Sequence, residues 1–175
     1  MTEGEPTADA VRSQEARSPA ASQGTVSELM MPHHVNNLGN VFGGVILSMV
    51  DRAATVAAMR HAGRSCVTVS IDRVDFREPI YAGELVTCHA CVTYVGTTSM
   101  EIGVSVFAAD LLSGVERHTN TCFLTFVAID DDNRPVQVPR LELQSDNDRQ
   151  RFHEGRRRRE VRQALALEFG EKEKR

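Results

Sequence analysis

The feature that most constrains the fold of this chain is a segment, residues 41–63, that is apolar around almost its whole circumference. At 3.6 residues per turn it forms about five turns of helix, which Gly63 closes as a C-terminal cap. The apolar residues are Val45, Ile46, Leu47, Met49, Val50, Ala53, Ala54, Val56, Ala57, Ala58 and Met59. A helix that is apolar on all sides must be buried on most of them. The rest of the chain therefore has to wrap around it.

Strand patterns flank this helix on both sides. One short strand is expected at 25–31, ended by Pro32, and four more at 66–76, 85–95, 99–108 and 115–129. Strands joined by short turns pair antiparallel. The order predicts an α+β fold, in which one antiparallel sheet wraps around a single long central helix. The outer side of the helix would still need a cover, which a second copy of the chain would supply.

The 175 residues fit one domain with tails. Residues 1–24 lack periodicity, and we expect a disordered tail there. The domain itself is expected at 25–140, and residues 141–175 should form a charged C-terminal helix and tail. This last segment contains four consecutive arginines, 156–159. A run of charge is typical of a solvated helix face, so the arginines are left out of the predicted site.

Charge and hydropathy exclude several classes of partner. The formal net charge is -4, so nothing in the overall charge argues for nucleic acid or an anionic membrane as a ligand, and we expect neither. No apolar run approaches the roughly 18 residues that a membrane span requires. The first 24 residues carry acids and no apolar stretch, unlike a signal peptide, so we expect a cytoplasmic protein.

Two of the four cysteines, Cys88 and Cys91, form a C-x-x-C pair. Such a pair often marks a metal or redox site, but here it falls in a strand rich in β-branched residues. Residues three apart on a strand point to opposite faces, so the two thiols cannot share one ligand. We expect no metal, and thiols that act as small apolar residues.

Asp51 is the polar residue that the helix explains least well. It follows Met49 and Val50, in mid-helix, where aspartate is a poor helix former and too far from the first turn to cap it. A buried carboxylate is costly unless it is paired or hydrogen-bonded. Two interpretations stay open: a solvated or ion-paired residue, with Arg52 or Arg60 as partner, or a chemical group.

The entry to the helix favours the chemical interpretation. Gly43 and Gly44 stand at its start, where exposed backbone N–H groups and the helix dipole suit an oxyanion or a polarised carbonyl. The Gly43 and Gly44 amides are therefore candidates for binding a carbonyl oxygen. Asn40 precedes them as a second polar candidate. The alternatives are a glycine-rich turn without a ligand, and Asn40 as a simple N-cap.

In order along the chain, these motifs resemble the signature of hot-dog acyl-CoA thioesterases, in the branch of bacterial single-domain enzymes related to the animal brain-type acyl-CoA hydrolase. The resemblance covers about residues 25 to 160. It rests on Met31-Pro32, Asn36, the segment 39–44 (GNVFGG), Asp51, and the segments 67–79, 83–84, 96–100, 126–139 and 151–160. It implies a hot-dog domain that hydrolyses acyl-CoA to a free fatty acid and coenzyme A, without a further cofactor, in fatty acid metabolism.

The resemblance also implies roles for particular residues. Asp51 stands at the position of the catalytic carboxylate, which acts as general base on water or as nucleophile. Asn40 stands where a polar group orients the water or the thioester. The turn Gly96–Ser99, with Thr97 and Thr98, resembles a segment near coenzyme A, although a plain hairpin turn is an equally common explanation. Apart from the resemblance, the arginines at 156–159 could meet the coenzyme A phosphates, but a solvated helix face is the more common explanation of such a run, and they stay outside the predicted site.

The implied assembly is a dimer whose protomers join their sheets, with three dimers forming a hexamer. Asn40 of one protomer would then face Asp51 of another. Two departures from the family pattern concern Arg52, directly after the aspartate, and the pair His33-His34 in the preceding loop.

Hot-dog folds also host non-catalytic acyl-CoA-binding regulators and hydratases or dehydratases. A regulator has no need for an embedded aspartate, and a dehydratase should place a histidine opposite an acid. Neither His61, at the helix end, nor His89, on a strand, fits that position. Thioester hydrolysis is therefore the first expectation and the other two remain alternatives.

Overall fold

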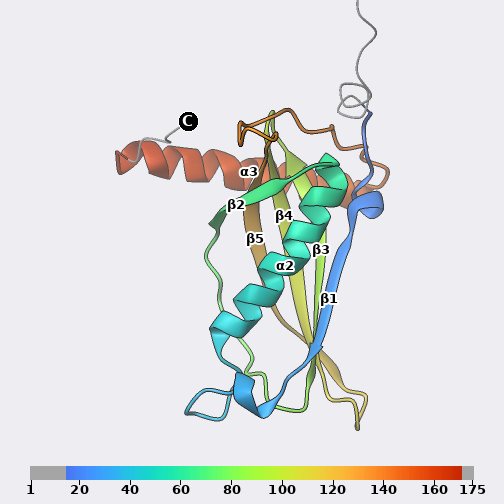
Figure 1. The fold of residues 1–175 in the computed structure, drawn as a ribbon, viewed down its shortest axis with the longest axis vertical. Helices are drawn as coiled ribbons and strands as arrows, with labels where there is room; N and C mark the ends of the chain where they lie inside the picture. The colour runs from blue at the N-terminus through green and yellow to red at the C-terminus, as the bar shows by residue number, and fades with distance from the viewer. Residues whose placement is uncertain (1–14, 171–175) are drawn as a thin grey trace, which may run out of the picture.

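In the computed structural model, which describes residues 15–170, one antiparallel sheet curls around one long helix (Figure 1). The elements are the 3₁₀ turns η1 (Pro19–Ser22) and η2 (Pro32–His34), the strands β1 (Gly24–Leu29), β2 (Cys66–Ile71), β3 (Leu85–Val95), β4 (Ser99–Ala109) and β5 (Glu116–Ala128), and the helices α2 (Gly43–Ala62) and α3 (Asp146–Glu168). The strand order is β1-β3-β4-β5-β2, and every pairing is antiparallel. The expected α+β architecture is confirmed.

The core lies between α2 and the inner face of the sheet. Alternate residues of the three central strands point inward and are fully buried, among them Val104, Leu124 and Phe126. The helix meets them with small residues such as Ala53 and Ala57. These alanines let the strands approach the helix axis closely, so one helix fills the curl of the sheet.

The cysteine pair divides between the two faces of β3, as predicted. Cys88 points into the core, where burial raises its pKa to about 12. Cys91 points to the outer face, where Arg151 Nη1 lies 3.4 Å from its sulfur. Among residues 15–170, no group of three or more His, Cys, Asp or Glu is placed to hold a metal ion. No helix in this range is both long and apolar enough to cross a membrane.

Two expected boundaries are wrong. The strand expected at 66–76 ends at Ile71, because the chain turns away after the Asp72 N–H donates to the carbonyl of Phe123 (2.9 Å). The disorder expected up to residue 24 does not hold for residues 15–24. Arg17 there donates to the carbonyl oxygens of Arg60 (2.9 Å) and His61 (2.6 Å), which fixes the segment on the end of α2. Residues 1–14 lie outside the described range.

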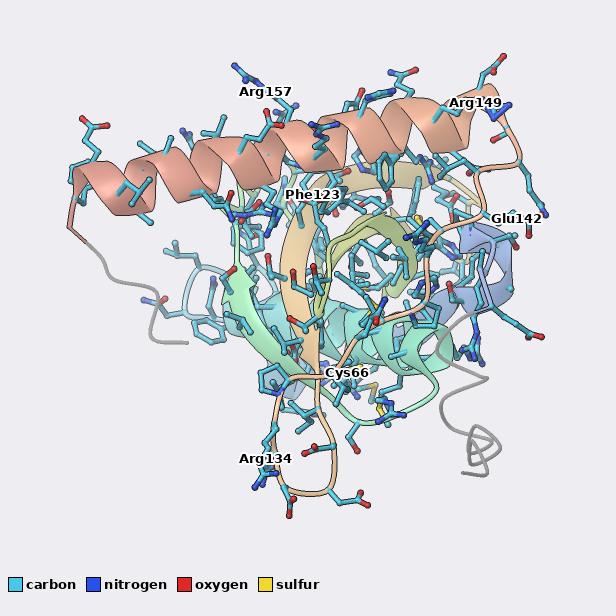
Figure 2. All side chains as sticks on the ribbon, turned by 90° about the horizontal axis from the view of Figure 1, so that it is seen from above. Cys66, Phe123, Arg134, Glu142, Arg149 and Arg157 are labelled. Carbon is cyan, nitrogen blue, oxygen red and sulfur yellow. The ribbon has the colours of Figure 1, made fainter. Side chains whose placement is uncertain are left out.

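Helix α3 lies across the outer face of the sheet (Figure 2). Ion pairs with a buried carboxylate hold it there. The carboxylate of Glu101, on β4, is fully buried and accepts from Arg158 (2.8 Å) and Arg162 (3.2 Å). Arg162 also pairs with Asp72 (2.5 Å), and the Arg158 guanidinium stacks 3.6 Å from the centre of the Phe123 ring. The C-terminal helix is thus part of the folded domain.

The expectation of a solvated arginine run is correct for only part of it. Arg156 and Arg157 face solvent and pair with Glu160 along the helix. Arg158 instead packs inward, and Arg159 lies beside the β3–β4 turn, 4.0 Å from where a Cβ on Gly96 would stand. The run therefore wraps around the helix and divides between solvent and sheet.

Gly155 permits this docking, and its replacement tests it. A Cβ on Gly155 would lie 2.7 Å from Glu101 Oε1 and 2.8 Å from Tyr94 Cβ. We expect Gly155→Ala to lower the free energy of unfolding by about 1–3 kcal/mol through overpacking, although alanine is the better helix former by roughly 1 kcal/mol. Urea unfolding measures the change. The exposed Arg157→Ala is the control and should stay close to wild type; a Gly155→Ala protein as stable as wild type would contradict the packing.

The buried ring of His61 predicts a stability that depends on pH. Its ring is buried at the end of α2, with Nε2 3.0 Å from the carbonyl oxygen of Pro139, to which it donates, and Nδ1 3.5 Å from Ser22 Oγ. Burial lowers the pKa of His61, the bond to Pro139 partly opposes this, and the charge of Arg17 lowers it further. The unfolded chain therefore binds this proton more readily than the folded chain.

We expect stability to fall as the pH drops below the ordinary histidine value of about 6.5, with a contribution of at most about 1.4 kcal/mol per pH unit. His61→Gln keeps an amide that can donate to Pro139 but does not titrate, so it should flatten this dependence. Urea midpoints between pH 5 and 8 measure it. His153→Gln, on α3, should retain the wild-type slope, and equal slopes in wild type and His61→Gln would exclude the mechanism.

Candidate functional site

Asp51 projects from the middle of α2 toward β2 and is half-buried. Its Oδ1 accepts a hydrogen bond of 2.7 Å from Thr68 Oγ1. Strand β2 has a register shift against β5 between Thr68 and Ser70, directly after the threonine. A short hydroxyl–carboxylate bond restrains the aspartate while its second oxygen stays available. The carboxylate is thus held in place by a neutral group.

The ion pairs considered for Asp51 are absent from the described residues. Arg52 turns to the other side of α2 and pairs with Glu28 of β1 (2.8 Å). Arg60 donates to the backbone carbonyl of Gln23. The interpretation of Asp51 as the partner of either arginine is therefore wrong.

The loop before α2 is organised by Asn36. The side-chain Oδ1 of Asn36 accepts from the backbone N–H groups of Leu38 (2.8 Å) and Asn40 (3.2 Å). The backbone N–H of Asn36 donates to the backbone carbonyl of Asn40 (2.7 Å). Asn40 takes part through its backbone, and residues 15–170 provide no hydrogen bond to its side chain. The N-cap of α2 is Phe42, so the interpretation of Asn40 as the cap is wrong.

Gly43 and Gly44 are the first two residues of α2, and Phe42 supplies no side-chain cap to their N–H groups. Aromatic rings pack against both glycines: a Cβ on Gly43 would lie 3.2 Å from the Phe76 ring, and one on Gly44 would collide with the Phe42 ring. The glycines therefore accommodate these rings. Their uncapped N–H groups remain suited to a carbonyl oxygen or an anion.

Within one protomer the predicted residues lie far apart. From Gly43 to Asp51 the helix rises about 12 Å. The turn Gly96–Ser99 lies beyond the other end of α2, since the Thr98 carbonyl accepts from Ala128 (3.1 Å) and the neighbouring Ile129 donates to Ser65 (3.0 Å), just past the helix (Figure 1). The structure does not bring the three groups together in one copy of the chain.

The turn itself is a hydrogen-bonded hairpin turn. The N–H of Gly96 donates to the carbonyl of Ser99 (2.8 Å), and the Thr97 and Thr98 carbonyls accept from Val138 and Ala128. These bonds account for its shape without a ligand. Its predicted contact with coenzyme A stays a prediction.

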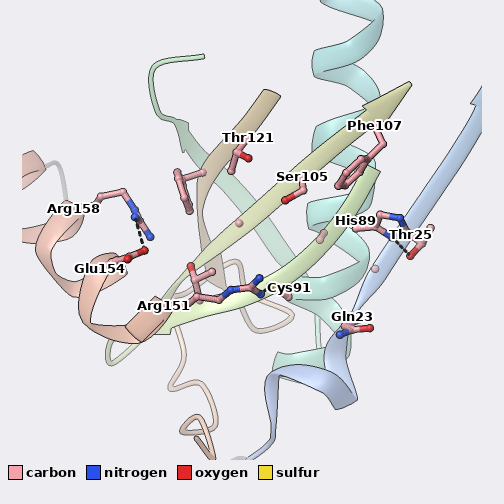
Figure 3. Close-up of a pocket in the computed structure, with 15 residues that line it drawn as sticks. Gln23, Thr25, His89, Cys91, Ser105, Phe107, Thr121, Arg151, Glu154 and Arg158 are labelled. Atoms are coloured by element: carbon pink, nitrogen blue, oxygen red, sulfur yellow. Dashed lines mark hydrogen bonds and ion pairs between the residues drawn. The ribbon is translucent and has the colours of Figure 1, made fainter. Parts of the chain in front are cut away.

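A cavity of about 530 Å³ opens on the outer face of the sheet, between β1, β3–β5 and the first half of α3 (Figure 3). Its lining includes His89, Ser105, Phe107 and Arg151. None of the predicted site residues lines it, because Asp51 and the glycines belong to the opposite face of the sheet.

Comparisons with known proteins give this geometry a context. The family model of the thioesterase superfamily matches residues 38–114. The chain is 38% identical over 148 residues to the Bacillus subtilis protein named uncharacterized acyl-CoA thioester hydrolase YkhA, covering 81% of this chain and 86% of that protein. It is 30% identical over 139 residues to the rat cytosolic acyl coenzyme A thioester hydrolase, covering 78% of this chain but 36% of that longer protein.

Solved structures share the fold. An acyl-CoA hydrolase from Staphylococcus aureus, in complex with butyryl coenzyme A, coenzyme A and coenzyme A disulfide, superposes with a TM-score of 0.82 at 32% identity, over 89% of this chain and 94% of that chain. An apo-hexameric acyl-CoA thioesterase gives a TM-score of 0.83 at 35% identity, over 87% of this chain and 97% of that chain.

The S. aureus enzyme has also been solved with single alanine replacements of an asparagine, an aspartate and a threonine. In its own sequence the asparagine stands 15 positions before the aspartate and the threonine 17 positions after it. Asn36 and Thr68 stand at the same spacings from Asp51 here. Sequence reasoning named neither as a site residue. Asn36 was visible only as one residue of a motif, and Thr68 is an ordinary strand residue until the fold sets it against Asp51.

Proposed function

The chain belongs to the acyl-CoA thioester hydrolases of the thioesterase superfamily and has their hot-dog fold, and from this premise we propose that it converts acyl-CoA to a free fatty acid and coenzyme A at a site built by two protomers. The observation that carries the proposal is the half-buried Asp51 held by Thr68 at 2.7 Å. A carboxylate restrained by a neutral hydroxyl, with no ion pair to a cation among residues 15–170, is suited to act on a reactive acyl group.

In the proposed mechanism Asp51 acts in one of two ways. As general base it takes a proton from the water that attacks the thioester carbon, and the coenzyme A thiolate that leaves as the C–S bond breaks accepts a proton; as nucleophile it attacks the thioester carbon itself, expels the coenzyme A thiolate and forms an acyl anhydride, which water then hydrolyses. The Thr68 hydroxyl donates to one carboxylate oxygen and leaves the other free to act. The uncapped N–H groups of Gly43 and Gly44 would hold the carbonyl oxygen as negative charge develops on it. A thioester is already activated, so this set needs no metal ion.

The asparagine that orients the water or the thioester has two candidates. Asn40 is the sequence prediction, and its side chain finds no hydrogen bond within residues 15–170. Asn36 has the spacing of the asparagine replaced in the S. aureus enzyme. Its Oδ1 is occupied by two loop N–H groups, which leaves the NH₂ to donate to a substrate. We favour Asn36 as the orienting residue and Asn40 as part of the loop that holds it.

Geometry supports a site shared between protomers. Either asparagine precedes α2, whereas Asp51 lies about 12 Å along the helix from Gly43. Groups acting on one carbonyl must each approach it to about 3 Å. Among residues 15–170, strand β2 ends the sheet with one edge unpaired, and a second β2 could pair there. Such a pairing would join two sheets and bring the loop of one protomer toward Asp51 of the other.

Further features of the proposal come from the relatives. The hexameric relative supports a hexamer, for which we propose three β2-edge dimers, and the butyryl coenzyme A complex of the S. aureus enzyme supports acyl-CoA as the ligand. The rat relative is named cytosolic, and we propose the cytoplasm for this chain. The turn Gly96–Ser99, with Arg159 beside it, is the proposed neighbour of the coenzyme A nucleotide.

Release of free coenzyme A thiol from a chain-length series of acyl-CoAs tests the function. We expect Asp51→Ala to lower kcat by roughly 10²–10⁴-fold and Thr68→Val, which loses one bond to a charged group, by about tenfold or more. Asn36→Ala should lower kcat more than Asn40→Ala. A wild-type protein that binds acyl-CoA without hydrolysis would instead favour the regulator, and double-bond hydration would favour the hydratase.

Mixed assemblies test the shared site. Asn36→Ala and Asp51→Ala protomers are co-expressed with different tags, and the doubly tagged dimer is isolated. Each parent dimer has two defective sites, whereas an isologous mixed dimer has one doubly defective site and one intact site. We expect the mixed dimer to regain about half of the wild-type turnover. If it remains as inactive as its parents, each site belongs to one protomer.

A further inference from the structure

Helix α3 crosses the sheet nearly at right angles to the strands. Arg151 contacts Cys91 on β3, Arg158 reaches Glu101 on β4, and Arg162 reaches Asp72, directly after β2. From 151 to 162 the helix rises about 16 Å, and β3 and β2 are three strand spacings apart, about 14 Å. The helix has therefore reached the last strand of the sheet at Arg162.

The helix continues past this edge. The segment 163–170, here called the α3 arm, projects beyond β2 (Figures 1 and 2). Its character differs from that of the docked part, which meets the sheet through the charged side chains of arginines 151, 158 and 162, with Gly155 and Phe152 packed against β3 and β4 between them. At helical spacing the same stripe continues as Leu165, Ala166 and Phe169. Leu165 is 46% exposed and Phe169 72% exposed, so residues 15–170 leave this apolar stripe uncovered.

The surface beside the arm is apolar as well. On the outer face of the sheet, Val67 of β2 pairs with Val127 of β5, and both turn away from the core that Phe126 and Ala128 enter. Val67 is 43% exposed. The arm and this valine patch both border the unpaired edge of β2, on the same outer side of the sheet.

We infer that the α3 arm packs on the outer face of a second copy of this chain, over the partner's β2 and β5, and locks the two sheets together. Two β2 strands pairing antiparallel about the middle of Cys66–Ile71 place Ser70 of one opposite Val67 of the other. The arm leaves its own sheet at Asp72, next to that level. From Arg162 to Phe169 it rises about 10 Å, two strand spacings, which reaches from the partner's β2 to its β5.

Symmetry favours a second copy as the occupant. In a two-fold dimer the arm of each protomer meets the valine patch of the other. A single β2–β2 pairing therefore covers both arms and both valine patches. The inference rests on the β2-edge dimer of the proposed function, but not on hydrolysis. Under this inference the two parts of α3 have different roles. The buried ion pairs fix the direction of the helix on its own sheet, and the apolar arm binds the partner.

Paired variants with a matched control test the arm. Leu165→Glu combined with Phe169→Glu should raise the dimer dissociation constant at least about tenfold, measured by sedimentation over a dilution series. Leu167→Glu is the control: it adds a charge on the same arm, but this leucine is 81% exposed and points away from the sheet-facing stripe. It should assemble like wild type. Circular dichroism checks that α3 remains helical in both proteins.

Cross-linking tests the geometry directly. In a Cys66→Ser, Cys91→Ser background, mild oxidation of the double variant Val67→Cys, Leu165→Cys should give a covalent dimer. The pair Val67→Cys, Leu167→Cys and each single variant should give far less. Unchanged assembly of the Glu variant, or equal cross-linking at 165 and 167, overturns the inference. If the wild-type protein hydrolyses no acyl-CoA but the Glu variant loses assembly, the proposed function is refuted and the inference on the α3 arm is supported. If the wild-type protein hydrolyses acyl-CoA but the Glu variant assembles normally, the inference on the arm is refuted and the proposed function is supported.

Discussion

The burial of α2 is the constraint on which the rest of the structure depends. The helix has too much apolar surface to lie on a flat sheet, so the strands curl around it and their inward residues form a single core. Small residues such as Ala53 and Ala57 set how close the sheet can come. A polar group on such a helix lies near a strand wherever it points inward. Asp51 is therefore close enough to β2 for Thr68 to bind it, and the core that creates the fold also creates the restrained carboxylate.

Local sequence patterns predicted most of the secondary structure. They failed where contacts between residues far apart in the sequence determine the structure. The helix, three of the strand ranges and the two faces of the Cys88 and Cys91 pair follow from periodicity, which burial enforces. Strand β2 ends at Ile71, where the Asp72 N–H makes the last backbone bond to β5, and the local pattern of residues 66–76 does not indicate this end. Thr68 is one of many threonines on strands, and its proximity to Asp51 comes from packing. Asn40 stands out in the sequence shortly before the pair Gly43-Gly44, whereas the loop is organised around Asn36.

The C-terminal helix shows how composition can mislead. Its arginines indicate a solvated face, yet Glu101 is buried beneath two of them. The available signal was Gly155, a single glycine in the middle of a charged helix. Glycine lowers helix stability, so its presence there indicates that another part of the chain packs too closely to leave room for a side chain. A buried ion cluster contributes little net stability. It does penalise a different placement of α3 on the sheet, since one charge left buried and unpaired would cost about 3–5 kcal/mol. The cluster is therefore suited to fixing the direction of α3, which matters for a helix that extends beyond its own sheet.

Strand β2 connects these features. Thr68 on this strand holds Asp51, the residue after its end binds Arg162 of α3, and its free edge is where a second sheet could join. A change at any of these points alters the position of the same short strand. A dimer formed along β2 would stabilise the strand that carries the carboxylate's partner, so assembly and catalysis would depend on the same backbone. A protomer alone would keep its core, because the core lies between α2 and the three central strands, but its β2 would be held along one edge only. The restraint on Asp51 should then be weaker in the separated protomer than in the assembly, even where both protomers are fully folded.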